Sequence, residues 1–251
     1  MRTRVKYCGL VRPQDVDAAV AIGADAIGFV FYSRSPRLLD VEAAVSLRRR
    51  LPSWVTAVGL FVNEPVSLIE PLARRVGLDA IQLHGDETPS QAQALQIPWW
   101  KAIRVGAGSA PEPRGALDDQ ASGALRPAKA GESLEAGEAG EAGEVGEATR
   151  QSLARALEAF AGAEYCLLDS LSAGYGGSGR TFDWTLVPEG AGPRLIVSGG
   201  LDAANVGAAV GSLRPFAVDT STGIQSEAPR RKDVGRMEQF MEAVRRADGR
   251  P

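Results

Sequence analysis

Short apolar runs alternate with stretches of helical spacing along the chain, a pattern typical of βα units around a parallel sheet. The apolar runs predict eight strands, over Val5–Gly9, Ala26–Phe31, Ala57–Val62, Ala80–Leu83, Trp100–Arg104, Tyr165–Asp169, Leu195–Ser198 and Phe216–Asp219. Helices are expected over Pro13–Ile22, Val41–Arg50, Pro65–Val76, Pro89–Leu95, Gln151–Phe160, Ala203–Leu213 and Lys232–Arg246, and the connection around Trp184–Glu189 is short and weakly patterned.

Eight βα units favour an α/β fold consisting of a single (β/α)8 TIM barrel that spans residues 1–251. An open doubly wound sheet usually has fewer strands, and the first βα turn lacks the G-x-G-x-x-G fingerprint of dinucleotide-binding sheets. In a barrel the catalytic side chains lie at the carboxyl ends of the strands and in the loops that follow.

One segment, residues 106–148, has a composition unlike the rest of the chain. It holds nine of the 29 glycines and nine acidic residues against three basic ones, and it ends in Gly-Glu-Ala repeats. Its net charge of -6 leaves +3 for the other residues of a chain whose total is -3. Few apolar side chains are present to offset the entropy of an ordered loop, so we expect a disordered acidic insertion after strand five.

The remaining composition limits the class of protein. At 44% hydrophobic and 24% charged residues the chain is typical of a globular protein, and no apolar run is long enough to span a membrane. Residues 1–10 do not have the pattern of a secretory signal, and the two cysteines form no disulfide framework, so a cytoplasmic location is expected. With one histidine and no clustered cysteines we expect no metal site, and the absence of long basic runs disfavours nucleic acid as a partner.

Three loops in the C-terminal half combine glycines with hydroxyl side chains, which suits an anion. Glycines let backbone N–H groups approach a phosphate, and hydroxyls add further donors. Each loop alone is equally consistent with an ordinary turn. Because the three follow consecutive strands, together they predict a phosphate site, with candidate residues Gly177, Ser178, Gly179, Ser198, Gly199, Gly200, Asp219, Thr220 and Ser221.

Candidate catalytic groups stand at the ends of strands one and six. Cys8 closes the first and Asp169 the sixth, and a thiolate and a carboxylic acid form a competent base and acid. The alternative for Cys8 is a small buried apolar residue. Lys6 shares a strand face with Cys8, where it can lower the pKa of the thiol or serve as a salt-bridged barrel lysine. Arg37 is either a carboxylate ligand or a solvated surface arginine.

The same positions carry a set of motifs that resembles the phosphoribosylanthranilate isomerase family of tryptophan biosynthesis. These motifs are Lys6-Tyr7-Cys8-Gly9-Leu10, Phe31-Tyr32-Ser33-Arg34-Ser35-Pro36-Arg37, Gln82-Leu83-His84-Gly85-Asp86-Glu87, Leu168-Asp169-Ser170, Gly176-Gly177-Ser178-Gly179-Arg180-Thr181-Phe182-Asp183-Trp184 and Ser198-Gly199-Gly200-Leu201. They occur in order at both ends of the chain, and only the acidic insertion lies outside the resemblance.

The resemblance implies a cofactor-free Amadori rearrangement of N-(5-phosphoribosyl)anthranilate on a TIM barrel. Asp169 is then the general acid that opens the sugar ring and Cys8 the base that removes the C2 proton. Arg37 holds the anthranilate carboxylate, His84 is a hydrogen-bonded positioning residue in the substrate site, and the glycine loops hold the phosphate. The partner is thus a small phosphosugar, and both a monomer and a homodimer are consistent with the sequence.

Two kinds of alternative remain at this stage. One is another isomerase or lyase on a phosphate-binding barrel, such as the phosphoribosyl-formimino imidazole isomerase, which usually pairs two aspartates, or indole-glycerol-phosphate synthase, which needs lysine and glutamate groups at its strand ends. An isomerase that accepts a second phosphoribosyl substrate is also open. The other is a catalytically silent phosphate-binding scaffold, in which Cys8 and Asp169 are dispensable.

Overall fold

The computed structural model describes residues 2–106, 139–170, 181–228 and 230–249, and it contains a closed barrel of eight parallel strands in sequence order. The strands are β1 (Arg4–Cys8), β2 (Ala26–Val30), β3 (Thr56–Phe61), β4 (Ala80–Leu83), β5 (Trp99–Val105), β6 (Tyr165–Ser170), β7 (Leu195–Val197) and β8 (Ala217–Thr220). Because β8 pairs with β1, the sheet has no free edge. The prediction of a (β/α)8 barrel is confirmed.

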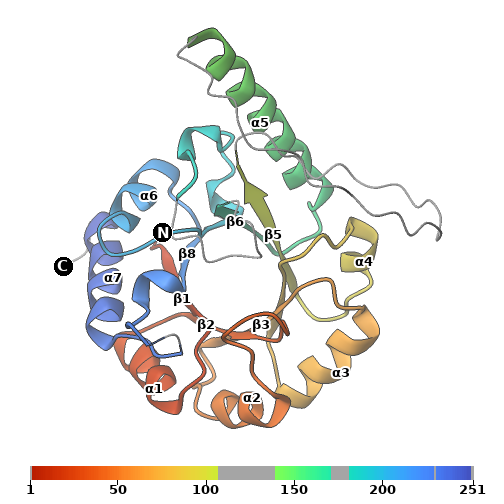
Figure 1. Cartoon of the computed structure of the whole chain (residues 1–251), viewed down its shortest axis with the longest axis vertical. Helices are drawn as coiled ribbons and strands as arrows, with labels where there is room; N and C mark the ends of the chain where they lie inside the picture. Colours follow the sequence, from red (N-terminus) through yellow and green to blue (C-terminus); the bar gives the residue numbers. More distant parts are fainter. Residues whose placement is uncertain (1, 107–138, 171–180, 229, 250–251) are drawn as a thin grey trace, which may run out of the picture.

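The helices surround the barrel as a ring (Figure 1). They are α1 (Pro13–Ile22), α2 (Val41–Arg48), α3 (Val66–Val76), α4 (Pro89–Gln93), α5 (Ala139–Ala159), α6 (Val206–Leu213) and α7 (Val234–Ala247). The weakly patterned connection after β6 contains two short 3-10 turns, η1 (Trp184–Leu186) and η2 (Gly192–Arg194), and a third, η3 (Thr222–Ile224), follows β8.

Local chemistry sets several helix ends. Pro13 begins α1, and Gly23 ends it in a left-handed conformation with a φ of 97°. The side chain of Asp40 accepts a hydrogen bond from the backbone N–H of Ala43 and caps α2, and Thr88 caps α4 within a capping box.

Helix α5 begins earlier than the sequence predicts. Its first residue is Ala139, twelve residues before the expected start at Gln151, so the last part of the predicted insertion is helical. Alanine and glutamate are strong helix formers, and over residues 139–150 they extend the helix that follows despite three intervening glycines. In Figure 1 this N-terminal part of α5 extends beyond the ring of the other helices. Residues 107–138 of the predicted insertion lie outside the described residues.

Two apolar layers hold the barrel together. Small residues and a few large ones fill its interior: Ala26, Val58, Ala80, Trp100, Ala102, Leu167, Ile196 and Ala217. A larger layer, which includes Cys166, packs between the strands and the helices, as strand alternation predicts for that cysteine. The two layers leave the carboxyl ends of the strands as the place where polar side chains enter the barrel.

Aromatic side chains close the amino end of the barrel. Tyr165 stacks on Phe216 with 4.0 Å between ring centroids, and Trp100 meets Tyr165 edge-on. The guanidinium of Arg4 lies 4.1 Å from the centroid of the Phe216 ring. This end of the barrel is therefore filled by packing rather than open to a substrate.

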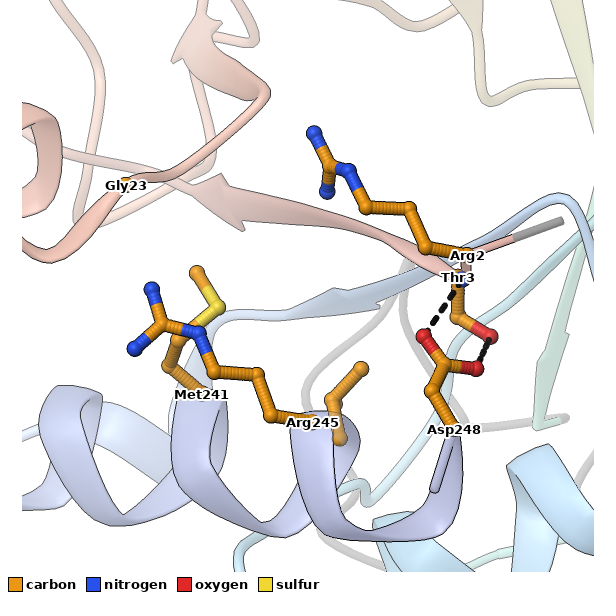
Figure 2. A pocket seen from close by; sticks show the side chains of 7 residues that line it. Arg2, Thr3, Gly23, Met241, Arg245 and Asp248 are labelled. Atoms are coloured by element: carbon orange, nitrogen blue, oxygen red, sulfur yellow. Dashed lines mark hydrogen bonds between the residues drawn. The ribbon is translucent and has the colours of Figure 1, made fainter. Parts of the chain in front are cut away.

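A small pocket lies at the amino end of β1, between the ends of α1 and α7. It has a volume of about 290 Å³ and is lined by residues that include Arg2, Gly23 and Arg245. Figure 2 shows the Asp248 carboxylate turned toward Thr3, from whose N–H and hydroxyl it accepts hydrogen bonds of 2.7 and 2.8 Å. These bonds join the C-terminus of α7 to the start of β1, a stabilising role typical of this face of a barrel.

Candidate active site

Asp169 stands near the carboxyl end of β6 at the mouth of the barrel, buried and hydrogen-bonded to His84. His84 follows β4, and its Nε2 lies 3.1 Å from Oδ2 of Asp169. The other ring nitrogen, Nδ1, lies 2.8 Å from the amide nitrogen of Gln82. The structure thus brings His84 and Asp169 together in a buried row of three side chains that reaches from β4 to β6.

Cys8 ends β1, three strands from β6 around the closed barrel, and shares its environment with Lys6. A Cβ atom built on Gly28 would lie 2.7 Å from the sulfur of Cys8 and 3.2 Å from Nζ of Lys6, so both groups cover that glycine. A larger residue at position 28 would displace the thiol. Lys6 in turn forms a buried ion pair of 2.8 Å with Asp219 of β8, its register neighbour.

The pKa of the Cys8 thiol is raised, although the sequence allows the neighbouring Lys6 to lower it. Burial raises the pKa of the thiol above its ordinary value, and the ammonium of Lys6 lowers it only in part. Burial also opposes the charge on Lys6, but Asp219 and Cys8 outweigh burial and raise the pKa of the lysine. Lys6 is therefore a charged, salt-bridged barrel lysine that favours the thiolate, yet burial keeps the Cys8 thiol mostly protonated at neutral pH.

Hydrogen bonds connect the turn after β7 to the end of β8. The Ser198 hydroxyl donates to Asp219 at 3.1 Å, and the Thr220 hydroxyl donates to the carbonyl of Leu201 at 2.7 Å. Both hydroxyl hydrogens are thus used inside the protein, whereas the sequence analysis expected them to face an anion. Gly199 and Gly200 both have positive φ, 81° and 64°, and form the close turn that the glycines predict.

The loop after β8 reaches back to Cys8 and Arg37. The Ser221 hydroxyl donates to the carbonyl of Cys8 at 3.0 Å. Arg37 crosses above Gly9, whose φ of 72° and missing side chain admit the guanidinium stem, and it donates to the side chain of Gln225. Arg37 is half-buried at the barrel mouth and is not a solvated surface residue.

Lys232 is a buried cation of this region that the sequence analysis did not single out. Its Nζ donates to the carbonyl of Ser221 at 2.8 Å, and its backbone N–H donates to Asp15 at 3.2 Å. Burial, together with the charge of Arg37, lowers its pKa to about 7. The available signal is its position next to Asp233, the N-cap of α7, which pins residue 232 against the barrel.

We expect Lys232 to make stability depend on pH. Between about pH 7 and its ordinary value of 10.5, the unfolded chain carries a proton on Lys232 that the folded chain lacks. The free energy of unfolding should therefore rise with pH in this range, by up to about 1.4 kcal/mol per pH unit. Urea unfolding at pH 7 and 9 measures the rise, which Lys232→Met should reduce. An identical pH dependence in the variant would contradict the assignment.

A second buried ion pair holds the loop that carries His84. Lys101 of β5 donates to Glu87 and to the carbonyl of Gly85, both at 2.7 Å. Glu87 also accepts from the backbone N–H groups of Gly85 and Asn63. Lys101 and Glu87 are 4% and 7% exposed, and burial lowers the pKa of the lysine despite its partner. The pair was missed because a charged residue within an apolar strand has no local sequence signal for its partner.

Glu87→Gln should destabilise the fold by about 3 kcal/mol, since it leaves a buried ammonium without its counter-charge. The matched control is Glu242→Gln, which breaks an exposed pair with Arg246 and should cost less than about 0.5 kcal/mol. Urea unfolding of both variants at pH 7 provides the comparison. Equal and small losses would show that the Lys101–Glu87 pair is not a structural requirement.

Some sequence predictions fall outside these observations. Gly177, Ser178 and Gly179 lie outside the described residues, so their part in the phosphate site stays a prediction. Within the part of the chain that the structure describes, no group of three His, Cys, Asp or Glu side chains is placed to hold a metal ion. None of the helices there is long and apolar enough to cross a membrane.

Comparison with protein families identifies a relationship along nearly the whole chain. The family model described as N-(5'-phosphoribosyl)anthranilate (PRA) isomerase matches residues 5–120 and 144–243. The chain belongs to the phosphoribosylanthranilate isomerase family. Between the two matched ranges, residues 121–143 are unmatched; they lie within the predicted insertion, which the sequence placed at residues 106–148.

Individual relatives agree with the family. The N-(5'-phosphoribosyl)anthranilate isomerase of Methylibium petroleiphilum is 41% identical over 250 residues, covering 100% of this chain and 97% of the relative. The corresponding protein of Ralstonia nicotianae is 40% identical and covers 98% of this chain and 94% of its own.

Solved structures of the family are also similar. The phosphoribosyl anthranilate isomerase of Thermotoga maritima has a TM-score of 0.71 and 32% identity, with 98% of this chain and 99% of that chain covered. Another isomerase structure, in complex with reduced 1-(o-carboxyphenylamino)-1-deoxyribulose 5-phosphate, has a TM-score of 0.68 and 29% identity, with 98% and 99% covered.

Proposed function

We propose that the carboxyl end of this barrel isomerises N-(5-phosphoribosyl)anthranilate with Asp169 as the acid and Cys8 as the base. The reaction belongs to tryptophan biosynthesis and forms 1-(2-carboxyphenylamino)-1-deoxyribulose 5-phosphate. One buried carboxyl and one buried thiol stand at strand ends on different sides of the barrel mouth, each near its own hydrogen-bonding or charged partner. This placement supports the residue assignment. A substrate held between them meets an acid on one side and a base on the other.

The first step is the opening of the ribose ring. Asp169 in its acid form gives a proton to the ring oxygen, the bond between that oxygen and C1 breaks, and the anilino nitrogen supplies the electron pair that forms an iminium ion. The cationic nitrogen makes the neighbouring C2 proton more acidic. A base of moderate strength is then sufficient for the next step.

Cys8 as thiolate removes the C2 proton, and the electron pair of that bond neutralises the iminium to give an enolamine. In the final tautomerisation C1 gains a proton and the C2 hydroxyl loses one. Asp169 thereby regains its proton and Cys8 loses the one it accepted, so both groups return to their starting state. The reaction requires a free thiol, which supports a reducing, cytoplasmic location, and both cysteines are free.

The substrate's two anionic ends have separate partners in this proposal. Arg37 binds the anthranilate carboxylate, since its side chain is half-buried at the mouth and packs over Gly9, the residue that follows Cys8. The phosphate binds to backbone N–H groups of the turn Ser198-Gly199-Gly200, of Thr220 at the end of β8 and of Ser221 after it. Asp219 accepts hydrogen bonds from Lys6 and Ser198 and so holds both side chains in place.

Replacing Arg37 tests the assignment of the carboxylate. Arg37→Met should raise KM about 10- to 100-fold, because a charge-assisted hydrogen bond to the substrate is lost in both ground and transition state, with kcat nearly unchanged. The control is Arg34→Met, an exposed arginine of the same loop, which should leave both constants unchanged. Steady-state kinetics, followed by the loss of phosphoribosylanthranilate fluorescence, measures both constants. A fall in kcat without a change in KM would assign Arg37 to another role.

A further inference from the structure

In the row formed by Gln82, His84 and Asp169, one side chain, Gln82, has no role in the proposed reaction. Gln82 of β4 is fully buried, and its amide nitrogen lies 2.8 Å from Nδ1 of His84. Among the described residues no group hydrogen-bonds to its Oε1. A buried glutamine whose amide oxygen has no partner among the described residues indicates that the hydrogen bond of its amide nitrogen to His84 is the reason for its placement.

The amide orientation decides which nitrogen of His84 carries the proton. With the NH2 group toward Nδ1, the amide donates, so Nδ1 must be unprotonated and Nε2 carries the hydrogen. The opposite orientation would place an NH2 group with two hydrogens where no described acceptor lies. Unmatched buried donors are less tolerated than an unmatched carbonyl oxygen, so the donating orientation is favoured.

The tautomer of His84 in turn decides where Asp169 holds its proton. An Nε2–H group donates to Oδ2 of Asp169 across 3.1 Å, so this oxygen is an acceptor in both states of the carboxyl. The acid proton must then reside on Oδ1. This second oxygen is directed toward the turn after β7, because a Cβ built on Gly199 would lie 2.8 Å from it.

We propose that Gln82 is a positioning residue that fixes His84 in its Nε2–H tautomer, so that His84 occupies Oδ2 of Asp169 and directs the acid proton of Oδ1 toward the substrate. This inference deepens the proposed function, because it takes Asp169 as the general acid. No proton passes through His84 or Gln82 in this arrangement. Both hydrogen bonds stay in place while Asp169 gives up and regains its proton.

The tautomer can be observed without turnover, because His84 is the only histidine of the chain. A sample without an affinity tag, labelled with 15N-histidine, gives signals from one imidazole only. At pH 7 we expect a pyridine-like, unprotonated Nδ1 and a pyrrole-like, protonated Nε2. The reverse assignment, or a mixture of both tautomers, would overturn the proposal.

Two substitutions at position 82 give the kinetic test. Gln82→Met keeps the length of the side chain but removes the donor. His84 should then populate both tautomers, and kcat should fall about 10-fold with KM unchanged. Gln82→Glu offers an acceptor to Nδ1, and should protonate that nitrogen and lower kcat about 100-fold. The matched control, Gln93→Glu on the exposed surface of α4, should leave kcat and the imidazole signals as in the wild type.

The outcomes separate this proposal from the proposed function. If Gln82→Met retains the single Nε2–H tautomer and the wild-type kcat, Gln82 does not position His84. If Gln82→Glu fails to fold, the wild-type spectrum and Gln82→Met still decide the question. If the tautomer is as expected but Asp169→Asn remains active, the assignment of the general acid fails while the tautomer assignment stands.

Discussion

Asp169→Asn is expected to lower kcat by about 10³-fold, because an amide cannot give a proton to the ring oxygen and general acid catalysis contributes roughly 10² to 10⁴. The amide still fills the same volume and still accepts the hydrogen bond from His84 through its oxygen. Binding of the reduced product analogue should therefore remain within a few fold of the wild type. Steady-state kinetics and titration with the analogue measure the two effects separately.

The matched control for this variant is Asp40→Asn, an exposed helix cap of α2 where asparagine serves as well as aspartate. It should retain wild-type kinetics. Loss of analogue binding together with kcat in Asp169→Asn would indicate a damaged site rather than a missing acid. A kcat within about threefold of the wild type would remove Asp169 from the mechanism altogether.

Cys8→Ser is expected to lower kcat by a similar factor, about 10³-fold, since a serine hydroxyl ionises far less readily than a thiol and is a poor base near neutral pH. The pKa of Cys8 is raised by burial, so wild-type kcat/KM should increase with pH above 7 as the thiolate forms. The serine variant should lose this increase. A pH series of kcat/KM for both proteins records it.

The same substitution at the chain's other cysteine is the natural control. Cys166 lies in the layer between strands and helices, so Cys166→Ser should reduce stability but leave kcat and its pH dependence unchanged. If Cys166→Ser lost activity while Cys8→Ser retained it, the assignment of the base would be wrong.

The architecture was predictable because strands and turns have local signals. All eight strands lie within a residue or so of their predicted positions, and α1 agrees at both ends, where Pro13 and Gly23 mark the helix. The start of α5 was not predictable. Its Gly-Glu-Ala repeats combine two strong helix formers with a helix-weakening glycine, and a composition argument favoured disorder over this helical extension.

For the candidate residues at the strand ends, the sequence predicted their place in the fold but not their contacts. Strand ends identified Cys8 and Asp169, whereas the partners of the hydroxyls of Ser198 and Thr220 come from other strands and loops. The pKa of Cys8 depends on how completely the thiol is buried, which strand alternation does not give. Gln82 stands in a recognised motif, but its role could not be assigned from sequence, since it arises only when β4 places Gln82 beside His84.

We expect this barrel to carry out the isomerisation with Asp169 and Cys8 alone as acid and base. The most direct test mixes purified, metal-free protein with N-(5-phosphoribosyl)anthranilate and follows the loss of this substrate's fluorescence, beside the Asp169→Asn and Cys8→Ser variants. We predict rapid loss of fluorescence with the wild type, no added cofactor, and rates about 10³-fold lower with each variant. Wild-type rates in both variants would contradict the roles of Asp169 and Cys8, and no turnover by the wild type would contradict the isomerase activity itself.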